Sequence, residues 1–266
     1  MPKAKVNGIN VDYAVEGKGE PLVMIMGLGG ARSSFRSQTG VFKKYYRTVT
    51  FDNRGVGKSD KPAGPYTINM MADDTLGLMN HLGIQRAHVL GVSMGGMIAQ
   101  ELAINHPERV DKLVLGCSFS KTGIGANSVG MRVAMEAYEK SSQDETSQRK
   151  LISAMLDLSF NSWSNRVFLR PIAKIAIRLY PVGGMLEQRK ALSTHDTTER
   201  LGMIGAPTLV ITGTDDRLVN PASSETIAEL VPNAKLVWVP GGGHYFFMEK
   251  HDDFNREVLR FLRGTP

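Results

Sequence analysis

Short apolar segments alternate with segments of helical pattern along most of this chain, and this alternation limits its possible folds more than any other feature. Residues 21–27, 87–92 and 207–213 are apolar at nearly every position, as expected of strands buried on both faces. A segment with the pattern of a helix follows each of them. The alternation predicts an α/β fold with a mostly parallel central sheet and helices on both of its faces.

The same patterns predict the remaining elements. Further strands are expected over 9–17, 47–52, 111–117 and 234–240. Helices are expected over 34–44, 67–83, 94–106, 221–230 and 252–262. In the second of these helices, Thr67 is the expected N-cap and Gly83 the expected stop.

Residues 118–200 break the alternation, because they show helical stretches and no convincing apolar strand. We therefore predict a core formed by residues 1–117 and 201–266, with 118–200 inserted as a helical cap. Within this cap, 165–181 carries basic residues four positions apart, at Arg166, Arg170, Lys174 and Arg178. We favour an amphipathic cap helix with its charged face in water over a helix that contacts anionic lipid.

Composition excludes several classes of protein. The 266 residues carry a net charge of +6, but no nucleic-acid motif and no basic run with interleaved aromatics is present. No apolar run approaches about 20 residues, so stable membrane insertion is not expected. The first residues lack the apolar core of a secretory signal, and Cys117 is the sole cysteine. We expect a cytoplasmic protein, either monomer or homodimer.

The stretch GVSMG, residues 91–95, places a serine between a predicted strand and a predicted helix. This is the G-x-S-x-G pattern of a sharp turn that projects a serine hydroxyl above the sheet. Side chains at the two outer positions would collide with neighbouring backbone, which explains Gly91 and Gly95. The start of the following helix directs free N–H groups towards the same place. Ser93 is therefore the candidate nucleophile.

A serine nucleophile needs a base and an acid that orients the base, expected later in the chain in the order acid, then histidine. Of the six histidines, His244 alone follows the last predicted strand in a glycine-rich loop, VPGGGHYFF. The loop after the preceding strand offers both Asp215 and Asp216. Spacing does not choose between these two carboxylates.

With these motifs the chain resembles the α/β-hydrolase superfamily. The family's G-x-x-D…P pattern is matched by Gly213, Asp216 and Pro221, so the resemblance selects Asp216 as the acid. Its G-H-x-x-x-x-E pattern is matched by Gly243, His244 and Glu249, and its D-x-R-G-x-G-x-S pattern by residues 52–59. The resemblance makes that last stretch, with Asp52 and Asp60, a loop-bracing element without a catalytic role.

The resemblance also implies an oxyanion hole, a pair of backbone N–H donors that stabilise the negative oxygen formed during acyl transfer. The donors would be Met94, which follows the nucleophile, and Leu28 in the stretch MGLGG. Met26 stands where many relatives have histidine, but backbone donors do not depend on that side chain.

The expected function is a serine hydrolase that cleaves small to medium carboxylic esters through an acyl-serine intermediate, a carboxylesterase. The alternative is a lactonase of the 3-oxoadipate enol-lactonase type. The substrate of that enzyme carries a carboxylate, which the excess of basic residues in 118–200 would attract. C–C hydrolase, perhydrolase, thioesterase and non-catalytic receptor roles rank below these. Dehalogenases and epoxide hydrolases of the superfamily use aspartate where this chain has serine. No cofactor or metal is expected, and the only expected partner is a small-molecule ester or lactone.

Overall fold

The sheet that the sequence predicts is present, with eight strands. The structure is a computed structural model that describes residues 2–121, 144–161 and 183–264, together with 133, 136, 137, 140 and 141. The strands are β1 (Lys3–Val6), β2 (Ile9–Glu16), β3 (Pro21–Ile25), β4 (Arg47–Phe51), β5 (Ala87–Val92), β6 (Val110–Gly116), β7 (Thr208–Gly213) and β8 (Ala234–Val239). Their order across the sheet is β1-β2-β4-β3-β5-β6-β7-β8.

The sheet is mostly parallel, as predicted. β1 pairs antiparallel with β2, and β2 antiparallel with β4, whereas every pairing from β4 to β8 is parallel. β3 and β5 lie at the centre, and the side chains of Leu22 to Ile25 are fully buried. Because both faces of these strands are covered, their sequences are apolar at successive positions rather than at alternate ones.

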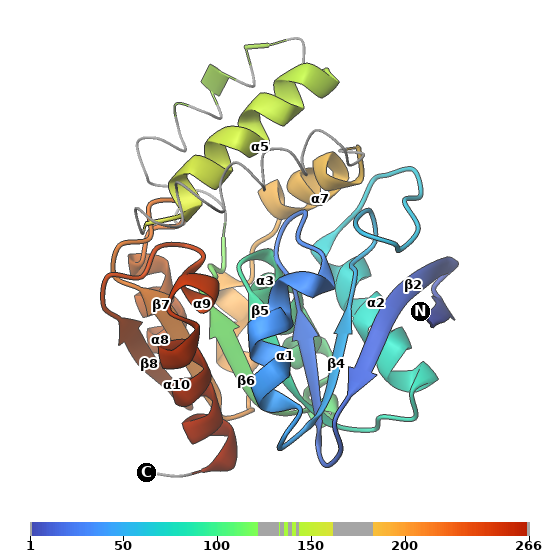
Figure 1. The fold of residues 1–266 in the computed structure, drawn as a ribbon, viewed down its shortest axis with the longest axis vertical. Helices are drawn as coiled ribbons and strands as arrows, with labels where there is room; N and C mark the ends of the chain where they lie inside the picture. The colour runs from blue at the N-terminus through green and yellow to red at the C-terminus, as the bar shows by residue number, and fades with distance from the viewer. Residues whose placement is uncertain are drawn as a thin grey trace.

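Helices cover both faces of the sheet (Figure 1). On one face, α1 (Arg36–Phe42) and α10 (His251–Arg263) pack with Leu22 and Met24 of β3 in one apolar cluster. On the other face, α2 (Ile68–His81), α3 (Met94–Asn105) and α8 (Ala222–Leu230) pack with Val23 and Ile25 in a second cluster. Alternate side chains of one strand thus contribute to two separate cores.

The predicted boundaries hold to within a few residues, and the differences have local causes. Thr67 caps α2 by accepting a hydrogen bond from the Met70 N–H, as predicted, and Gly83 follows the helix with a φ of +66°. The expected helix over 34–44 is shorter, because a 3₁₀ turn, η1 (Arg32–Phe35), precedes α1. Two further 3₁₀ turns, η2 (Pro107–Arg109) and η3 (Thr198–Met203), lie beside β6 and before β7.

Two helices of the region predicted as a cap lie beyond the carboxyl ends of the parallel strands (Figure 1). They are α5 (Glu145–Ser159) and α7 (Gly183–Ser193). Lys121 and Asp196 form an isolated antiparallel bridge and a 2.7 Å ion pair, and these contacts join the two ends of the region predicted as a cap. The basic stripe over 165–181 lies outside the described residues, and the cap boundaries of 118 and 200 stay a prediction.

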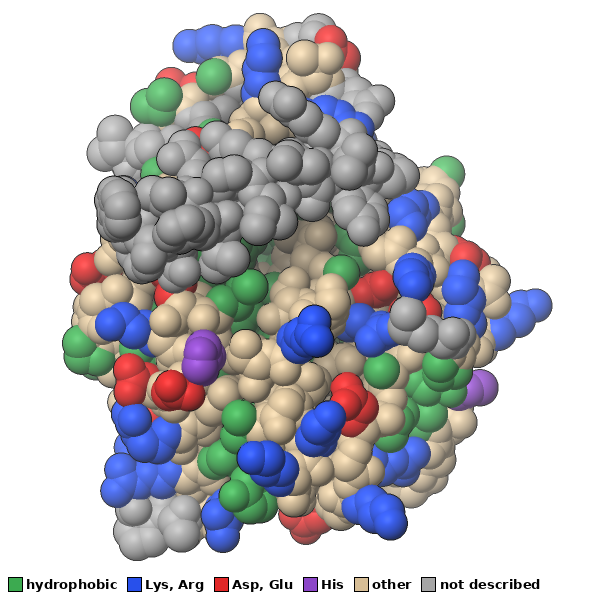
Figure 2. Space-filling view, in the orientation of Figure 1, with side chains coloured by type: hydrophobic (Ala, Val, Ile, Leu, Met, Phe, Trp, Pro, Cys, Tyr) green, Lys and Arg blue, Asp and Glu red, His purple; other side chains and the backbone are tan. Residues whose placement is uncertain are grey.

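No helix within the described ranges has both the length and the apolar character needed to cross a membrane. Figure 2 shows Lys and Arg side chains scattered over the viewed face and interspersed with acidic ones.

Candidate active site

Ser93 occupies a strained turn between β5 and α3. Its φ of +54° and ψ of −122° are rare for a residue with a side chain. The Ser93 N–H is fixed by a 2.8 Å hydrogen bond to the Gly116 carbonyl at the end of β6. A Cβ on Gly91 would lie 2.2 Å from the Gly95 carbonyl oxygen, and one on Gly95 would lie 2.1 Å from that of Ile25. The two glycines of the motif are therefore sterically required, as predicted.

His244 reaches the Ser93 hydroxyl from the loop after β8. Its Nε2 lies 3.1 Å from the serine Oγ, within hydrogen-bond distance, although 151 residues separate the two in the chain. The whole residue is 2% exposed. The next residue, Tyr245, donates its backbone N–H to the carbonyl of Ser159 at the end of α5, at 3.1 Å. The loop that carries His244 is thus attached to a helix of the predicted cap.

Asp216, not Asp215, meets the other side of the His244 ring. Its Oδ2 lies 2.7 Å from His244 Nδ1, and its Oδ1 accepts the backbone N–H groups of Leu218 and Val219 at 2.9 Å each. Both oxygens of this buried carboxylate are therefore satisfied. Asp215 is exposed and accepts a hydrogen bond from the Asn161 side chain at 3.0 Å. Geometry thus separates two carboxylates that spacing alone left equivalent.

The stretch MGLGG follows β3 and lies directly against Ser93. A Cβ on Gly27 would be 3.1 Å from the Ser93 Cβ, so only glycine permits this approach without displacement. In the described part of the chain, neither the Leu28 N–H nor the Met94 N–H donates a hydrogen bond. Among the described residues, both N–H groups are thus available to donate a hydrogen bond to a ligand oxygen, while their role as an oxyanion hole stays a prediction.

Three polar residues near this cluster carried no signal in the sequence. Ser118 donates its hydroxyl to the Ser93 carbonyl at 2.9 Å, and a Cβ on Gly96 would lie 2.4 Å from that hydroxyl. Asn161, which follows α5, donates its side-chain N–H to Asp215 in the loop after β7, and its backbone N–H to the carboxylate of Glu249 at 3.1 Å. Gln188 of α7 accepts the Gly29 N–H at 2.9 Å. Each contact joins segments far apart in sequence.

The stretch 52–59 braces a loop, as the family resemblance implies. The Asp52 carboxylate accepts the backbone N–H of Arg32 at 2.7 Å and that of Lys58 at 2.8 Å. A Cβ on Gly57 would lie 2.0 Å from Asp52 Oδ2, so the carboxylate fills the space beside this glycine. Asp60 accepts the backbone and side-chain N–H groups of Asn10 at 2.9 Å each, which lowers the pKa of its carboxyl.

Two further ionisable groups near the cluster stay protonated at neutral pH. Burial, with a smaller contribution from the charge of Asp216, raises the pKa of the Cys117 thiol well above its usual value. Burial likewise raises the pKa of Tyr245 to about 12. A buried thiol held neutral is a poor nucleophile, so Cys117 does not compete with Ser93. Among the described residues, no group of three His, Cys, Asp or Glu side chains is arranged to hold a metal ion.

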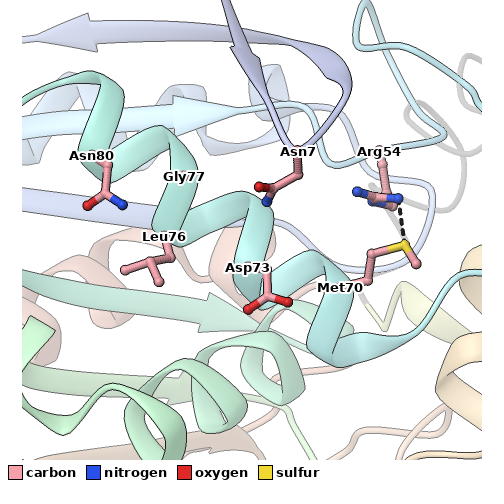
Figure 3. Close-up of a pocket in the computed structure, with 7 residues that line it drawn as sticks. All are labelled: Asn7, Arg54, Met70, Asp73, Leu76, Gly77 and Asn80. Atoms are coloured by element: carbon pink, nitrogen blue, oxygen red, sulfur yellow. Dashed lines mark hydrogen bonds between the residues drawn. The ribbon is translucent and has the colours of Figure 1, made fainter.

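A pocket of about 390 Å³ lies elsewhere, along α2 (Figure 3). Its lining residues come from the β1–β2 turn, the loop after β4 and α2, namely Asn7, Arg54, Met70, Asp73, Leu76, Gly77 and Asn80. The guanidinium of Arg54 is held by two hydrogen bonds to Asp74, so it is already neutralised. None of Ser93, Asp216 and His244 lines this pocket.

Comparison with known proteins assigns the family. A family model described as alpha/beta hydrolase fold matches residues 20–251. A protein of Caulobacter sp. (strain K31), named as carbamate hydrolase RutD, is 33% identical over 92% of this chain and 91% of its own length. The solved enol-lactonase from Burkholderia xenovorans LB400 is 28% identical, with a TM-score of 0.83, and the match covers 98% of this chain and 100% of that chain.

A thermophilic esterase from Thermogutta terrifontis matches the fold of this chain as well as the enol-lactonase does. It is 25% identical, with a TM-score of 0.83, over 99% of this chain and 98% of its own. The fold, the match of the family model and these relatives agree with the resemblance drawn from the motifs. This chain therefore belongs to the alpha/beta hydrolase fold family and is a hydrolase.

Proposed function

We propose that the protein hydrolyses carboxylic esters of small to medium size through an acyl-serine intermediate. The observation that carries this proposal is the continuous chain of contacts from Ser93 Oγ to His244 Nε2, at 3.1 Å, and from His244 Nδ1 to Asp216 Oδ2, at 2.7 Å. A serine hydroxyl is a weak nucleophile at neutral pH, and this arrangement supplies the base that it needs.

The first half-reaction forms the acyl-enzyme. His244 takes the hydroxyl proton as Ser93 Oγ bonds to the ester carbonyl carbon, and the carbonyl oxygen becomes a tetrahedral oxyanion. The N–H groups of Leu28 and Met94 stabilise that oxyanion. The intermediate then collapses, the bond to the alkoxy oxygen breaks, and the alcohol leaves with the proton from His244.

Water completes the cycle by the same steps. His244 removes a proton from water as the water oxygen attacks the acyl carbon, and the Ser93 oxygen leaves with that proton. Asp216 orients the imidazole through Nδ1 and stabilises its charged form in both half-reactions. The backbone N–H groups of Leu218 and Val219 keep this carboxylate in place.

The division of the chain into a core, 1–117 with 201–266, and a cap, 118–200, belongs to the same proposal. The described helices α5 and α7 lie over the edge of the sheet where the three side chains meet, which supports a substrate site between the two parts (Figure 1). The sole cysteine favours the reducing cytoplasm. Monomer and homodimer both remain open.

A lactonase is the second candidate, favoured by the similarity to the enol-lactonase from Burkholderia xenovorans LB400 over nearly the whole of both chains. A lactone is a cyclic ester, so the same steps apply, except that the leaving hydroxyl stays attached to the acyl group. The relative named as a carbamate hydrolase adds carbamates, whose carbonyl carbon is open to the same attack. All three classes depend equally on Ser93.

The test is hydrolysis of p-nitrophenyl esters from acetate to laurate by the wild-type protein and by Ser93→Ala. We expect turnover that peaks at short or medium chains and falls at least about 10⁴-fold in the variant. Ser223→Ala, which truncates a buried serine on α8, is the matched control and should retain full activity. A lactone and a carbamate panel run in parallel identify the preferred class. Hydrolysis that survives in Ser93→Ala would overturn the proposal, as would a folded protein inactive on all three classes.

A further inference from the structure

Gln188, on the predicted cap helix α7, joins two loops of the core. Its side chain is fully buried. Its Oε1 accepts the backbone N–H of Gly29 at 2.9 Å, and its Nε2 donates to the backbone carbonyl of Arg54 at 2.7 Å. These partners lie 159 and 134 residues away in sequence, in the loops after β3 and β4. One amide therefore satisfies a part-buried donor and a buried acceptor of the core.

The Gly29 N–H belongs to the peptide group that directly follows Leu28. The loop after β3 is held from the core side by Asn53, whose side chain donates to the Met26 carbonyl at 2.9 Å, and by a turn from the Gly30 N–H to the Gly27 carbonyl. Gln188 supplies a further contact to this loop from α7, at the Gly29 N–H. Fixing the Leu28–Gly29 peptide plane limits the rotation of Leu28, and so the direction of the Leu28 N–H.

The position of α7 is itself fixed by close contacts. A Cβ on Gly184 would lie 2.0 Å from the Gly55 carbonyl oxygen, so the two backbones touch and only glycine fits. Met185 lies against Gly29, since a Cβ on Gly29 would be 1.7 Å from its Cε. Gly184, Gln188 and Ala191 are all buried and recur at intervals of four and three, so they form the inner face of the helix.

We infer that Gln188 is a positioning residue for the oxyanion hole, acting through the Gly29 N–H on the adjacent Leu28 donor. The inference rests on the proposed function, because it assigns the Leu28 N–H to the reacting carbonyl oxygen. If Gln188 has this role, then α7, a helix that lies outside the sheet, contributes to stabilising the transition state. A substrate that shifts α7 would therefore change the rate of the chemical step and not only the access to the site.

The test compares Gln188→Met with Gln188→Glu on the preferred p-nitrophenyl ester. Methionine fills the space but accepts no N–H hydrogen bond of useful strength, whereas glutamate keeps the acceptor for Gly29 and loses the donor to the Arg54 carbonyl. Since a donor lost outright costs 10²–10³-fold in kcat, we expect a misdirected donor to cost Gln188→Met about tenfold, with KM within twofold of wild type. Gln188→Glu should fall less than threefold. Lys190→Gln, an exposed change on the same helix, should leave both constants unchanged.

A second readout does not depend on ester turnover. Diethyl p-nitrophenyl phosphate transfers its phosphoryl group to an activated serine, with release of p-nitrophenolate, and its phosphoryl oxygen would occupy the same hole. The rate of this reaction should fall in Gln188→Met by the same factor as kcat. Equal losses in the two Gln188 variants, or a change in KM or melting temperature without a loss of kcat, would overturn the inference. Ser93→Ala tests the proposed function separately, because it must abolish both reactions whatever Gln188 does.

Discussion

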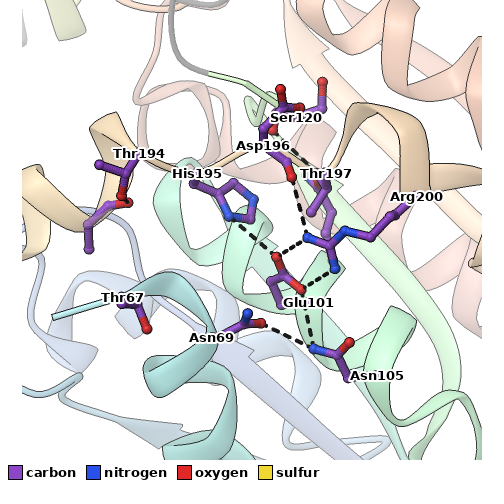
Figure 4. Close-up of polar contacts among 12 residues, drawn as sticks. Thr67, Asn69, Glu101, Asn105, Ser120, Thr194, His195, Asp196, Thr197 and Arg200 are labelled. Atoms are coloured by element: carbon purple, nitrogen blue, oxygen red, sulfur yellow. Dashed lines mark hydrogen bonds and ion pairs between the residues drawn. The ribbon is translucent and has the colours of Figure 1, made fainter.

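Two buried histidine–carboxylate pairs lie in the part of the chain that the structure describes, and their comparison shows what distinguishes a candidate active site from a structural contact. In the first pair, His244 is 2.7 Å from Asp216. In the second, His195 Nδ1 is 3.5 Å from Glu101 Oε1 (Figure 4). All four side chains are at most 7% exposed. Burial and pairing are therefore common to both and cannot identify the chemistry.

The carboxylates of Glu101 and Asp216 have different hydrogen-bond partners. Arg200 binds both oxygens of Glu101, at 2.9 Å and 2.6 Å, in a bidentate ion pair. Asp216 instead accepts two backbone N–H groups, and no Lys or Arg among the described residues forms an ion pair with it. Burial, as the largest cause, lowers the pKa of His195 to about 4, and the charge of Arg200 acts in the same direction. Glu101 opposes this shift only in part, so His195 is neutral at pH 7.

The Nε2 atoms of the two histidines differ even more in their contacts. His244 Nε2 contacts the Ser93 hydroxyl, whereas His195 Nε2 has no hydrogen-bond partner among the described residues. A histidine that acts as a base needs a proton donor at this nitrogen. The serine turn, more than the histidine–carboxylate pair, therefore distinguishes the candidate active site.

The largest expected effect separates the two histidines. We expect His244→Gln to lower kcat for ester hydrolysis at least about 10⁴-fold, because it removes the base, and His195→Gln to retain it within threefold. Initial rates at saturating substrate, measured with melting temperatures, check this. Loss of activity in a folded His195→Gln protein would break the distinction.

The next effect separates two adjacent carboxylates. Asp216→Asn should lower kcat by about 10³–10⁴-fold, because an amide favours the wrong tautomer of His244. Asp215→Asn keeps an acceptor for Asn161 on an exposed side chain, and should change kcat less than threefold. The two variants should be assayed from pH 6 to pH 9, and equal losses would show that the contact geometry does not decide the acid.

The smallest effect concerns stability and belongs to His195 alone. The folded-state pKa of about 4 lies below the unfolded value of about 6.5. The unfolded chain therefore binds more protons in this window, and the free energy of unfolding falls by up to about 3 kcal/mol as the pH drops from 6.5 to 4. Denaturant unfolding across this pH range should show a smaller decrease in the free energy of unfolding for His195→Gln than for the wild-type protein. An unchanged slope would assign the acid sensitivity to other groups.

Much of the fold follows from local pattern. The buried strands β3, β5 and β7 are continuous apolar runs, and Thr67 and Gly83 mark the ends of α2 through cap chemistry that needs no distant partner. The sequence pattern does not predict β1, because its four residues, KAKV, alternate over too short a length. It does not predict the helix α9 (Phe246–Glu249) either, because four residues are too few for a helical period to appear.

The position of Ser93 follows from the sequence alone, because a strained turn closed by Gly91 and Gly95 leaves a local signature, and so does the position of His244 after the last strand. The contacts that cross the sheet edge follow only from the three-dimensional fold. Asp215 and Asp216 are neighbours in one loop, and the choice depends on which of them the turn at Leu218 and Val219 directs inward. Gln188 gave no signal at all, since a buried amide is recognised only by partners that folding brings from more than 130 residues away.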